Sequence, residues 1–179
     1  MPFEFAILDF IQNNIRCGIL DFIMPKITAL GNAGILWILL TLVFLISKKY
    51  RKTGIVMMIA LILDLLFCNI ILKPVVARTR PYDINTAVTL LINKPGDYSF
   101  PSGHTAASFA SIAAMYFTKT QYRTIALVLG IIIAFSRLYL YVHFPTDVIG
   151  GAIIGVFCGW LAFKIYKNYI ENRKTVKEN

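Results

Sequence analysis

Two histidines are the residues best suited to acid–base or nucleophilic chemistry in this sequence of 179 residues. The second, His143, precedes Asp147 by one helical turn, and Pro145 between them suits the start of a helix. A carboxylate that holds one imidazole nitrogen fixes the tautomer and leaves the other nitrogen as an attacking lone pair. The spacing therefore predicts a nucleophilic histidine oriented by an aspartate. A purely structural helix cap is the alternative.

The first histidine, His104, ends the stretch Phe100-Pro-Ser-Gly-His. Ser102 is a suitable N-cap residue, and Gly103 allows a ligand to approach the backbone. The N-terminus of a helix offers free N–H groups and a partial positive charge, which together bind anions. A histidine in the first turn of such a helix is placed to act as a general acid toward a leaving oxygen. An ordinary helix start with an incidental histidine is the other interpretation.

Cations accompany both histidines. Lys73 and Arg80 lie in a segment that two prolines interrupt, and Arg137 shortly precedes the second histidine. Lysine offers a mobile point charge and arginine a planar fork, and both suit phosphate oxygens. Alone, the segment around Lys73 is equally consistent with side chains that snorkel to a membrane surface. Arg78 lies in the same segment. It either contacts a second phosphate or a headgroup, or is a plain interfacial charge.

Five apolar runs must position these residues, in a chain that is 58% hydrophobic and only 15% charged. A soluble domain usually has about a quarter charged residues. A helix needs roughly 20 residues to cross the hydrocarbon core, and backbone groups in lipid must be satisfied within the segment. We therefore expect an all-α fold, a polytopic transmembrane helix bundle. The runs are residues 34–46, 54–72, 105–117, 124–135 and 148–165.

Two polar residues, Asp64 and Asn69, interrupt the second run. A carboxylate is costly in the hydrocarbon core and is by default suspected of function. We expect both side chains to form structural hydrogen bonds to a neighbouring helix instead.

The N-terminal residues 3–16 show helical periodicity, with apolar side chains on one side and polar ones opposite. The pattern is typical of an amphipathic helix, either in the membrane interface or packed on the bundle. Residues 18–30, interrupted by Pro25, are consistent with a short re-entrant or interfacial helix. We expect five firm spans and leave a sixth open, giving an interfacial segment 1–30, a transmembrane domain 31–168 and a basic tail 169–179.

The formal charge of +9 gathers in alternate gaps between the runs and after the last one. The positive-inside rule makes these regions cytoplasmic, so the C-terminus is cytoplasmic and the gaps that carry the histidines face outward. Topology thus explains the basic composition, and no nucleic-acid partner is expected. The widely spaced cysteines are predicted to be free thiols rather than disulfide or metal ligands. They are Cys17, Cys68 and Cys158.

Together, the three polar stretches resemble the signature of the type-2 phosphatidic acid phosphatase superfamily, also called lipid phosphate phosphatases. Its pattern is KxxxxxxRP, then PSGH, then SRxxxxxHxxxD. The order and spacing agree over about residues 31–165. Haloperoxidases and glucose-6-phosphatases share these motifs, but the haloperoxidases are soluble and much longer. The matching stretches run from Lys73 to Arg80-Pro81, from Pro101 to His104, and from Ser136-Arg137 through His143 to Asp147.

The resemblance implies a role for each matching residue. His143 attacks phosphorus and forms a phosphohistidine, Asp147 orients it, and His104 protonates the leaving oxygen. It also implies a reaction without metal or other cofactor, and the outward loops hold only the scattered carboxylates Asp83 and Asp97. The phosphoryl oxygens would be held by Lys73, Arg80, Arg137, Ser102 and the backbone N–H of Gly103.

The function implied by the resemblance is a metal-independent phosphoric monoester or diphosphate hydrolase of the cell membrane, with a lipid phosphate as substrate. Similarity to compact bacterial members favours undecaprenyl diphosphate, the carrier recycled for cell-wall synthesis. Phosphatidylglycerol phosphate, phosphatidic acid and a water-soluble phosphate ester stay open. A non-enzymatic transporter or scaffold for phosphate lipids would need the cations, but neither a nucleophile nor an acid. The sequence leaves the oligomeric state open.

Overall fold

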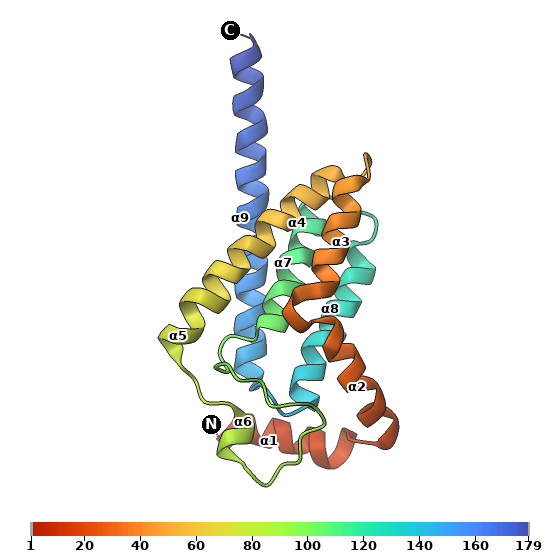
Figure 1. Ribbon diagram of the computed structural model, residues 1–179, viewed down its shortest axis with the longest axis vertical. Helices are drawn as coiled ribbons and strands as arrows, with labels where there is room; N and C mark the ends of the chain where they lie inside the picture. The colour runs from red at the N-terminus through yellow and green to blue at the C-terminus, as the bar shows by residue number, and fades with distance from the viewer. Residues whose placement is uncertain (1, 179) are drawn as a thin grey trace.

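The computed structural model describes the backbone of residues 2–178 and the side chains of residues 2–172. Every regular element in this part of the chain is helical (Figure 1), which confirms the expected all-α class. The helices are α1 (Pro2–Phe10), η1 (Ile11–Ile15), α2 (Gly18–Leu30), η2 (Asn32–Gly34), α3 (Ile35–Ile46), α4 (Arg51–Asp64), η3 (Leu65–Leu72), α5 (Lys73–Val76), α6 (Pro81–Ile84), α7 (Gly103–Phe117), α8 (Arg123–Tyr139) and α9 (Pro145–Glu178).

At the centre of the bundle, α7 packs along α9 and also contacts α4 and α8. Three glycines on α9 make this approach close. A Cβ built on Gly155 would lie 2.4 Å from the carbonyl oxygen of Ala106, and one on Gly159 would lie 2.5 Å from the Cβ of Ala113. Small residues at such positions let helix backbones approach within a membrane. Gly151, one turn earlier, faces the carbonyl oxygen of Ser102 in the same way, so α9 sets the position of the start of α7.

The long helix that leads to the first cation cluster changes its geometry on the way. α4 runs without a break into the π-helical segment η3, which continues into α5. The helix ends where Ala77 adopts a left-handed backbone conformation (φ 46°). The chain then passes through an extended linker into α6, which begins at Pro81. This confirms that the chain leaves its helix within the segment from Lys73 to Pro81.

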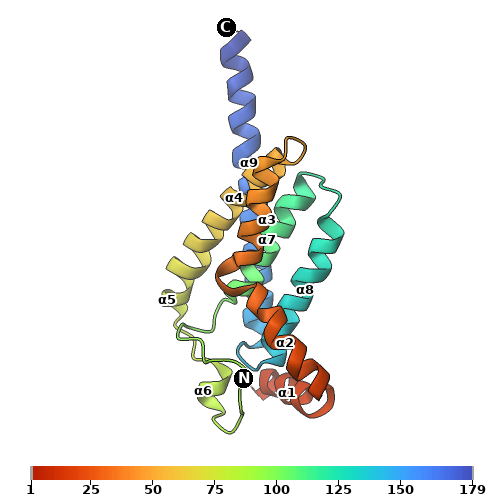
Figure 2. The ribbon, with the colours of Figure 1, turned by 45° about the vertical axis from the view of Figure 1, so that its right-hand side comes forward.

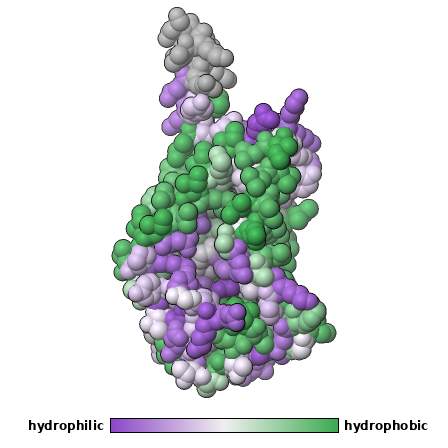
Figure 3. Space-filling model, viewed as in Figure 1, coloured by the Kyte–Doolittle hydropathy of each residue, from purple (hydrophilic) through white to green (hydrophobic). Residues whose placement is uncertain are grey.

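The described residues include two stretches that are long and apolar enough to cross a membrane, Arg51–Ile84 and Pro145–Asn172. The pair α2 and α3, bent by 47°, makes a third if it counts as one span. α7 and α8 have 15 and 17 residues, fewer than the roughly 20 of a full crossing. An apolar band covers the middle of the molecule (Figure 3). A count of five to six spans stays a prediction.

The two ends of the bundle differ in what they carry. The α3–α4 and α7–α8 connections lie at the end from which the C-terminal part of α9 projects (Figures 1 and 2). α1, α6 and the α8–α9 connection lie at the opposite end. This arrangement agrees with the alternation that the basic gaps predict.

The N-terminal segment is helical, as its periodicity predicts. Glu4, Leu8 and Ile11 form its buried side, whereas Phe3 and Phe10 are exposed. Leu8 and Ile11 thus pack on the bundle, while the exposed Phe3 and Phe10 leave a position in the membrane interface as a prediction. α2 is helical across Pro25, as expected for a short helix that leads into the first span.

Candidate active site

His143 and Asp147 lie together at the start of α9. Pro145 begins the helix as predicted, which puts Asp147 in its first turn and His143 just before it. The Nδ1 atom of His143 is 3.5 Å from Oδ2 of Asp147, and both side chains are almost completely buried. This separation is longer than a hydrogen bond. Such bonds are often long before a substrate is bound and tighten in the reacting complex.

Asp147 is held by donors on both of its carboxylate oxygens. Oδ2 accepts the backbone N–H of Phe144 at 2.8 Å, which is one half of a capping box. The same oxygen accepts the hydroxyl of Ser99 at 2.5 Å. Oδ1 accepts Nη1 of Arg78 at 2.5 Å. Three donors from separate parts of the chain therefore determine the direction of this carboxylate.

The cations Arg80 and Arg137 approach the two histidines. Nη1 of Arg80 lies 3.3 Å from Nε2 of His143 and donates to the carbonyl oxygen of Val142 at 2.6 Å. Nη1 of Arg137 donates to the hydroxyl of Thr28 at 2.5 Å, whereas its buried Nε has no hydrogen-bond partner in the part of the chain that the structure describes. A buried donor without a partner costs about 1–3 kcal/mol. This Nε is accordingly a donor that an anion can satisfy.

Burial and positive charge keep the His143 imidazole neutral. Burial lowers the pKa of His143 well below its ordinary value of 6.5, and the charges of Arg80, Arg137 and Lys73 lower it further. A neutral imidazole retains the lone pair that a nucleophile needs. Because Nδ1 faces Asp147, the lone pair belongs to Nε2, on the side of Arg80. This is the direction from which a phosphoryl group can approach.

Asp97 occupies a place that the sequence did not indicate. Its carboxylate bridges two of the cations, with Oδ2 on Nζ of Lys73 and Oδ1 at 2.6 Å from Nη2 of Arg80. Burial alone would raise the pKa of this carboxyl, but the hydrogen bonds and charges of Lys73 and Arg80 lower it to about 2. Asp97 is thus an anion at neutral pH, bound where the signature places phosphoryl oxygens.

His104 lies in the first turn of α7, as predicted. Its Nε2 is 3.0 Å from Oδ1 of Asn32 and 3.4 Å from Nη1 of Arg137. Gly31 makes room for the imidazole, since a Cβ there would lie 2.6 Å from its Cδ2 atom. Ser102 occupies the N-cap position, but its side chain makes no capping bond and accepts the hydroxyl of Thr105 instead.

One cavity of about 550 Å³ collects most of the predicted site residues. Ser102 and Asp147 lie behind its wall, so a direct role for the Ser102 side chain in phosphate binding stays a prediction. Among the described residues, no group of three or more His, Cys, Asp or Glu side chains can hold a metal ion. Metal independence itself stays a prediction. The predicted residues on the wall are Lys73, Arg80, Gly103, His104, Arg137 and His143.

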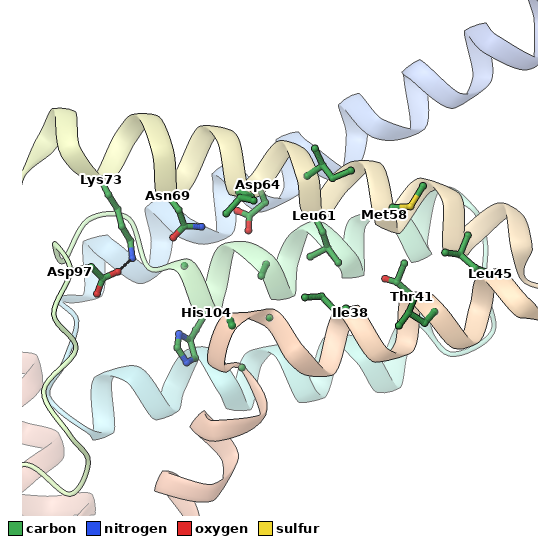
Figure 4. Close-up of a pocket in the computed structure, with 18 residues that line it drawn as sticks. Ile38, Thr41, Leu45, Met58, Leu61, Asp64, Asn69, Lys73, Asp97 and His104 are labelled. Carbon is green, nitrogen blue, oxygen red and sulfur yellow. Dashed lines mark hydrogen bonds and ion pairs between the residues drawn. The ribbon is translucent and has the colours of Figure 1, made fainter.

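A second cavity, of about 600 Å³, extends from the first between α3 and α4 (Figure 4). Its far part is lined by apolar side chains such as Leu45, Met58 and Leu61. Asp64 lies on its wall, and its Oδ1 has no hydrogen-bond partner among the residues whose side chains are described. The expected bond from this oxygen to a neighbouring helix is therefore not found there. The two cavities share Lys73, Asp97, Gly103 and His104, so the polar cavity and the apolar channel meet beside residues that are predicted to bind phosphate.

Some polar residues at the site were not found from the sequence. Thr28, Asn32 and Ser99 each bond to a predicted site residue, yet they lie far from it along the chain. Only their polarity beside apolar runs could have drawn attention to them. Arg78 was expected to contact a second phosphate or to be a plain interfacial charge, and the structure instead places it on Asp147.

Comparison with known proteins agrees with this geometry. Residues 53–171 match the family model described as the PAP2 superfamily. The chain belongs to the PAP2 superfamily. It is 32% identical to an undecaprenyl-diphosphatase of Sulfolobus acidocaldarius over 130 residues. This alignment covers 72% of the chain and 63% of that relative. It is 32% identical over 177 residues to phosphatidylglycerophosphatase B of Bacillus subtilis, covering 92% of the chain and 82% of that relative.

Solved structures of PAP2 proteins share the fold. The crystal structure of Aquifex aeolicus LpxE superposes with a TM-score of 0.76 at 28% identity, covering 90% of this chain and 95% of that one. A transmembrane PAP2-type phosphatidylglycerolphosphate phosphatase from B. subtilis gives a TM-score of 0.70 at 29% identity, over 93% and 84% of the two chains. Together with the apolar helices, these likenesses establish a PAP2 membrane protein.

Proposed function

We propose that this PAP2 protein hydrolyses a lipid phosphate or diphosphate through a phosphohistidine intermediate. The observation that carries the proposal is the junction of the two cavities. The polar one contains both histidines and three cations, and the apolar one extends from it between two membrane helices. A lipid phosphate has the same division into an anionic head and an apolar chain. This correspondence favours a lipid over a water-soluble phosphate ester.

In the first step, the bound anion offsets the nearby cations, so that His104 is protonated. Nε2 of His143 attacks phosphorus while the bond to the leaving oxygen breaks, and the protonated His104 gives that oxygen its proton. Asp147 stabilises the positive imidazole ring of the phosphohistidine. Lys73, Arg80 and Arg137 offset the negative charge that develops on the phosphoryl oxygens. In the second step, His104 takes a proton from water, the water oxygen attacks phosphorus, and phosphate leaves with His143 regenerated.

Undecaprenyl diphosphate is the first substrate to test. Its long apolar chain suits the channel between α3 and α4, and the S. acidocaldarius relative is named for action on it. A specific observation favours phosphatidylglycerol phosphate as the second candidate. Asp64 adds a polar group to the channel wall, and a glycerol-based lipid carries oxygen atoms near its phosphate, whereas a polyprenyl chain carries none.

The test is phosphate release by the purified protein from undecaprenyl diphosphate, phosphatidylglycerol phosphate and phosphatidic acid, in EDTA. We expect metal-free activity that His143→Ala abolishes and His104→Ala strongly reduces. Lys94→Ala is the control, because Lys94 is an exposed loop cation that does not line the two cavities. Rapid quenching should trap a phosphoprotein that is labile to acid and stable to base. Full activity of His143→Ala would contradict the mechanism.

The orientation is part of the proposal. The active site faces outward, the C-terminus is cytoplasmic, and five spans cross the cell membrane, with the bent pair α2 and α3 able to add a sixth. A cysteine in place of Asn93, an exposed loop residue at the active-site end, should react with an impermeant maleimide on intact cells. The exposed native Cys17 is first replaced by serine. Labelling only after lysis would show the opposite orientation.

A further inference from the structure

Arg78 joins two carboxylates that belong to distant parts of the chain. It lies in the linker between α5 and α6, outside the family signature. Its Nη1 donates to Oδ1 of Asp147 at 2.5 Å, and its Nη2 donates to Oε2 of Glu4, in α1, at 2.7 Å. Thr146 closes the group, because its hydroxyl donates to Glu4 and accepts Nη1 of Arg78 at 2.7 Å.

The two ion pairs of Arg78 are largely shielded from solvent, whereas Thr146 is exposed. Asp147 is fully buried, Glu4 is 8% exposed, and the Arg78 side chain is 16% exposed. Hydrogen bonds between charged groups are stronger than neutral ones, and guanidinium groups hold carboxylates with a defined geometry. Removing one member of a buried charge pair leaves the other uncompensated, which is strongly unfavourable. Each member of the group is therefore costly to remove.

The arrangement fixes which oxygen of Asp147 faces the proposed nucleophile. Arg78 takes Oδ1, while Ser99 and the N–H of Phe144 take Oδ2. Oδ2 is the oxygen that lies 3.5 Å from Nδ1 of His143. Without Arg78, Oδ1 would lose its charged partner, and the Asp147 carboxylate could rotate about the Cβ–Cγ bond. The direction of the His143 ring would then be less well defined.

The helix α1 braces the same loop from outside. The ring of Phe5 packs edge-on against the ring of Phe144, with 5.3 Å between the two centroids. The guanidinium of Arg78 lies over the same Phe144 ring, 4.2 Å from its centroid. The hydroxyl of Tyr141 donates to Asp9 of α1 at 2.7 Å. The loop that carries His143 is thus packed against α1 as well as bonded to it through Glu4.

We propose that Arg78 and Glu4 are positioning residues of the reaction. Arg78 holds Asp147 so that Oδ2 faces the His143 imidazole, and Glu4 holds Arg78 from α1. The inference rests on the proposed function, in which His143 attacks phosphorus. The N-terminal helix is then part of the catalytic unit, and its contribution extends beyond attachment to the membrane interface.

A double-mutant cycle separates positioning from a purely structural role. We expect Arg78→Gln to lower kcat at least tenfold with KM changed less than twofold, because Arg78 does not line the two cavities. Arg78→Lys should keep most of the activity. Asp147→Asn should also lower kcat, and adding Arg78→Gln to it should lower kcat by less than twofold more. Glu4→Gln should lower kcat severalfold alone and have no effect on top of Arg78→Gln.

Arg16→Gln is the matched control, because Arg16 also pairs with a carboxylate, Asp21 at 3.1 Å, away from the two cavities. It should keep wild-type kcat. The inference would be overturned if Arg78→Gln had a wild-type kcat. It would also be overturned if the fold-losses in kcat of Arg78→Gln and Asp147→Asn multiplied in the double mutant. If Arg78→Gln does not fold, Glu4→Gln decides it, and a wild-type kcat of Glu4→Gln overturns it. Full activity of His143→Ala would instead overturn the proposed function.

Discussion

The carboxylate of Asp97 lies on the guanidinium of Arg80, with Oδ1 2.6 Å from Nη2, while its other oxygen binds Lys73. Both cations belong to the set that the family signature assigns to phosphoryl oxygens. The loop residue therefore presents to the site the same kind of group that the substrate would bring. Because the Asp97 side chain is half exposed, a ligand can displace it at moderate cost.

Asp97→Asn should tighten the binding of inorganic phosphate. Loss of the competing charge leaves Lys73 and Arg80 less neutralised. A partly exposed ion pair is worth about 1 kcal/mol, so the inhibition constant for phosphate should fall by about fivefold. Asp83→Asn removes the same charge from an exposed position in α6 and should leave the constant unchanged. A constant that rises in Asp97→Asn would mean that Asp97 organises the cations rather than competing for them.

The protonation state of His143 can be measured directly, because the chain contains only two histidines. Burial and the nearby cations lower the pKa of His143, so its imidazole should stay neutral at pH 7 and titrate only below the ordinary value of 6.5. Histidine labelled with ¹⁵N reports the titration by NMR in detergent, and His104→Asn assigns the two signals. A His143 imidazole that is charged at pH 7 would contradict the expected nucleophile.

The motif residues could be placed from the sequence because each belongs to a short stretch with a defined local structure. Pro145 starts a helix and thereby sets Asp147 one turn after His143. Ser102 at an N-cap likewise puts His104 in a first turn. Each stretch borders an apolar helix, and the bundle brings these helix ends to one side.

Contacts between remote segments could not be predicted in this way. Glu4 meets Arg78 across 74 positions of sequence, and no spacing rule relates them. From the sequence, Asp97 could not be distinguished from any other loop carboxylate. The π-helical geometry of η3 also has no marker among its apolar residues, although it sets the face on which Asn69 lies. Such features depend on how the helices pack, which periodicity does not specify.

The close packing of α9 on α7 should make Gly155→Ala destabilising. Its new Cβ would lie 2.4 Å from the carbonyl oxygen of Ala106 and 2.8 Å from the backbone nitrogen of Ala110, and neither atom can move without its helix. Overpacking of this kind costs about 1–3 kcal/mol. We expect a lower thermal unfolding temperature in detergent, together with lower activity, because α7 carries His104. Gly18→Ala, with nothing within 4 Å of the new Cβ, should unfold like the wild type.

Asp64 provides the sharpest test of which lipid occupies the channel. The residue is 3% exposed, and among the described residues its Oδ1 has no hydrogen-bond partner, so it gains most from an occupant that offers a donor such as a hydroxyl. Asp64 lies about two and a half turns along the helix from Lys73, a distance of roughly 13 Å at the rise of an α-helix. Glycerol-based lipids carry ester and hydroxyl oxygens over this distance from the phosphate. Polyprenyl diphosphates carry only carbon beyond the diphosphate.

Asp64→Leu should therefore raise KM for phosphatidylglycerol phosphate at least fivefold and change KM for undecaprenyl diphosphate less than twofold. Asp64→Asn, which keeps the shape and hydrogen-bonding capacity of the side chain, should behave like the wild type toward both lipids. Steady-state kinetics of both variants in mixed micelles measures the two ratios. If Asp64→Leu raised KM equally for the two lipids, Asp64 would support the helix rather than recognise the lipid. A rise confined to undecaprenyl diphosphate would reverse the assignment, because it would place the polar group of the channel against the diphosphate itself.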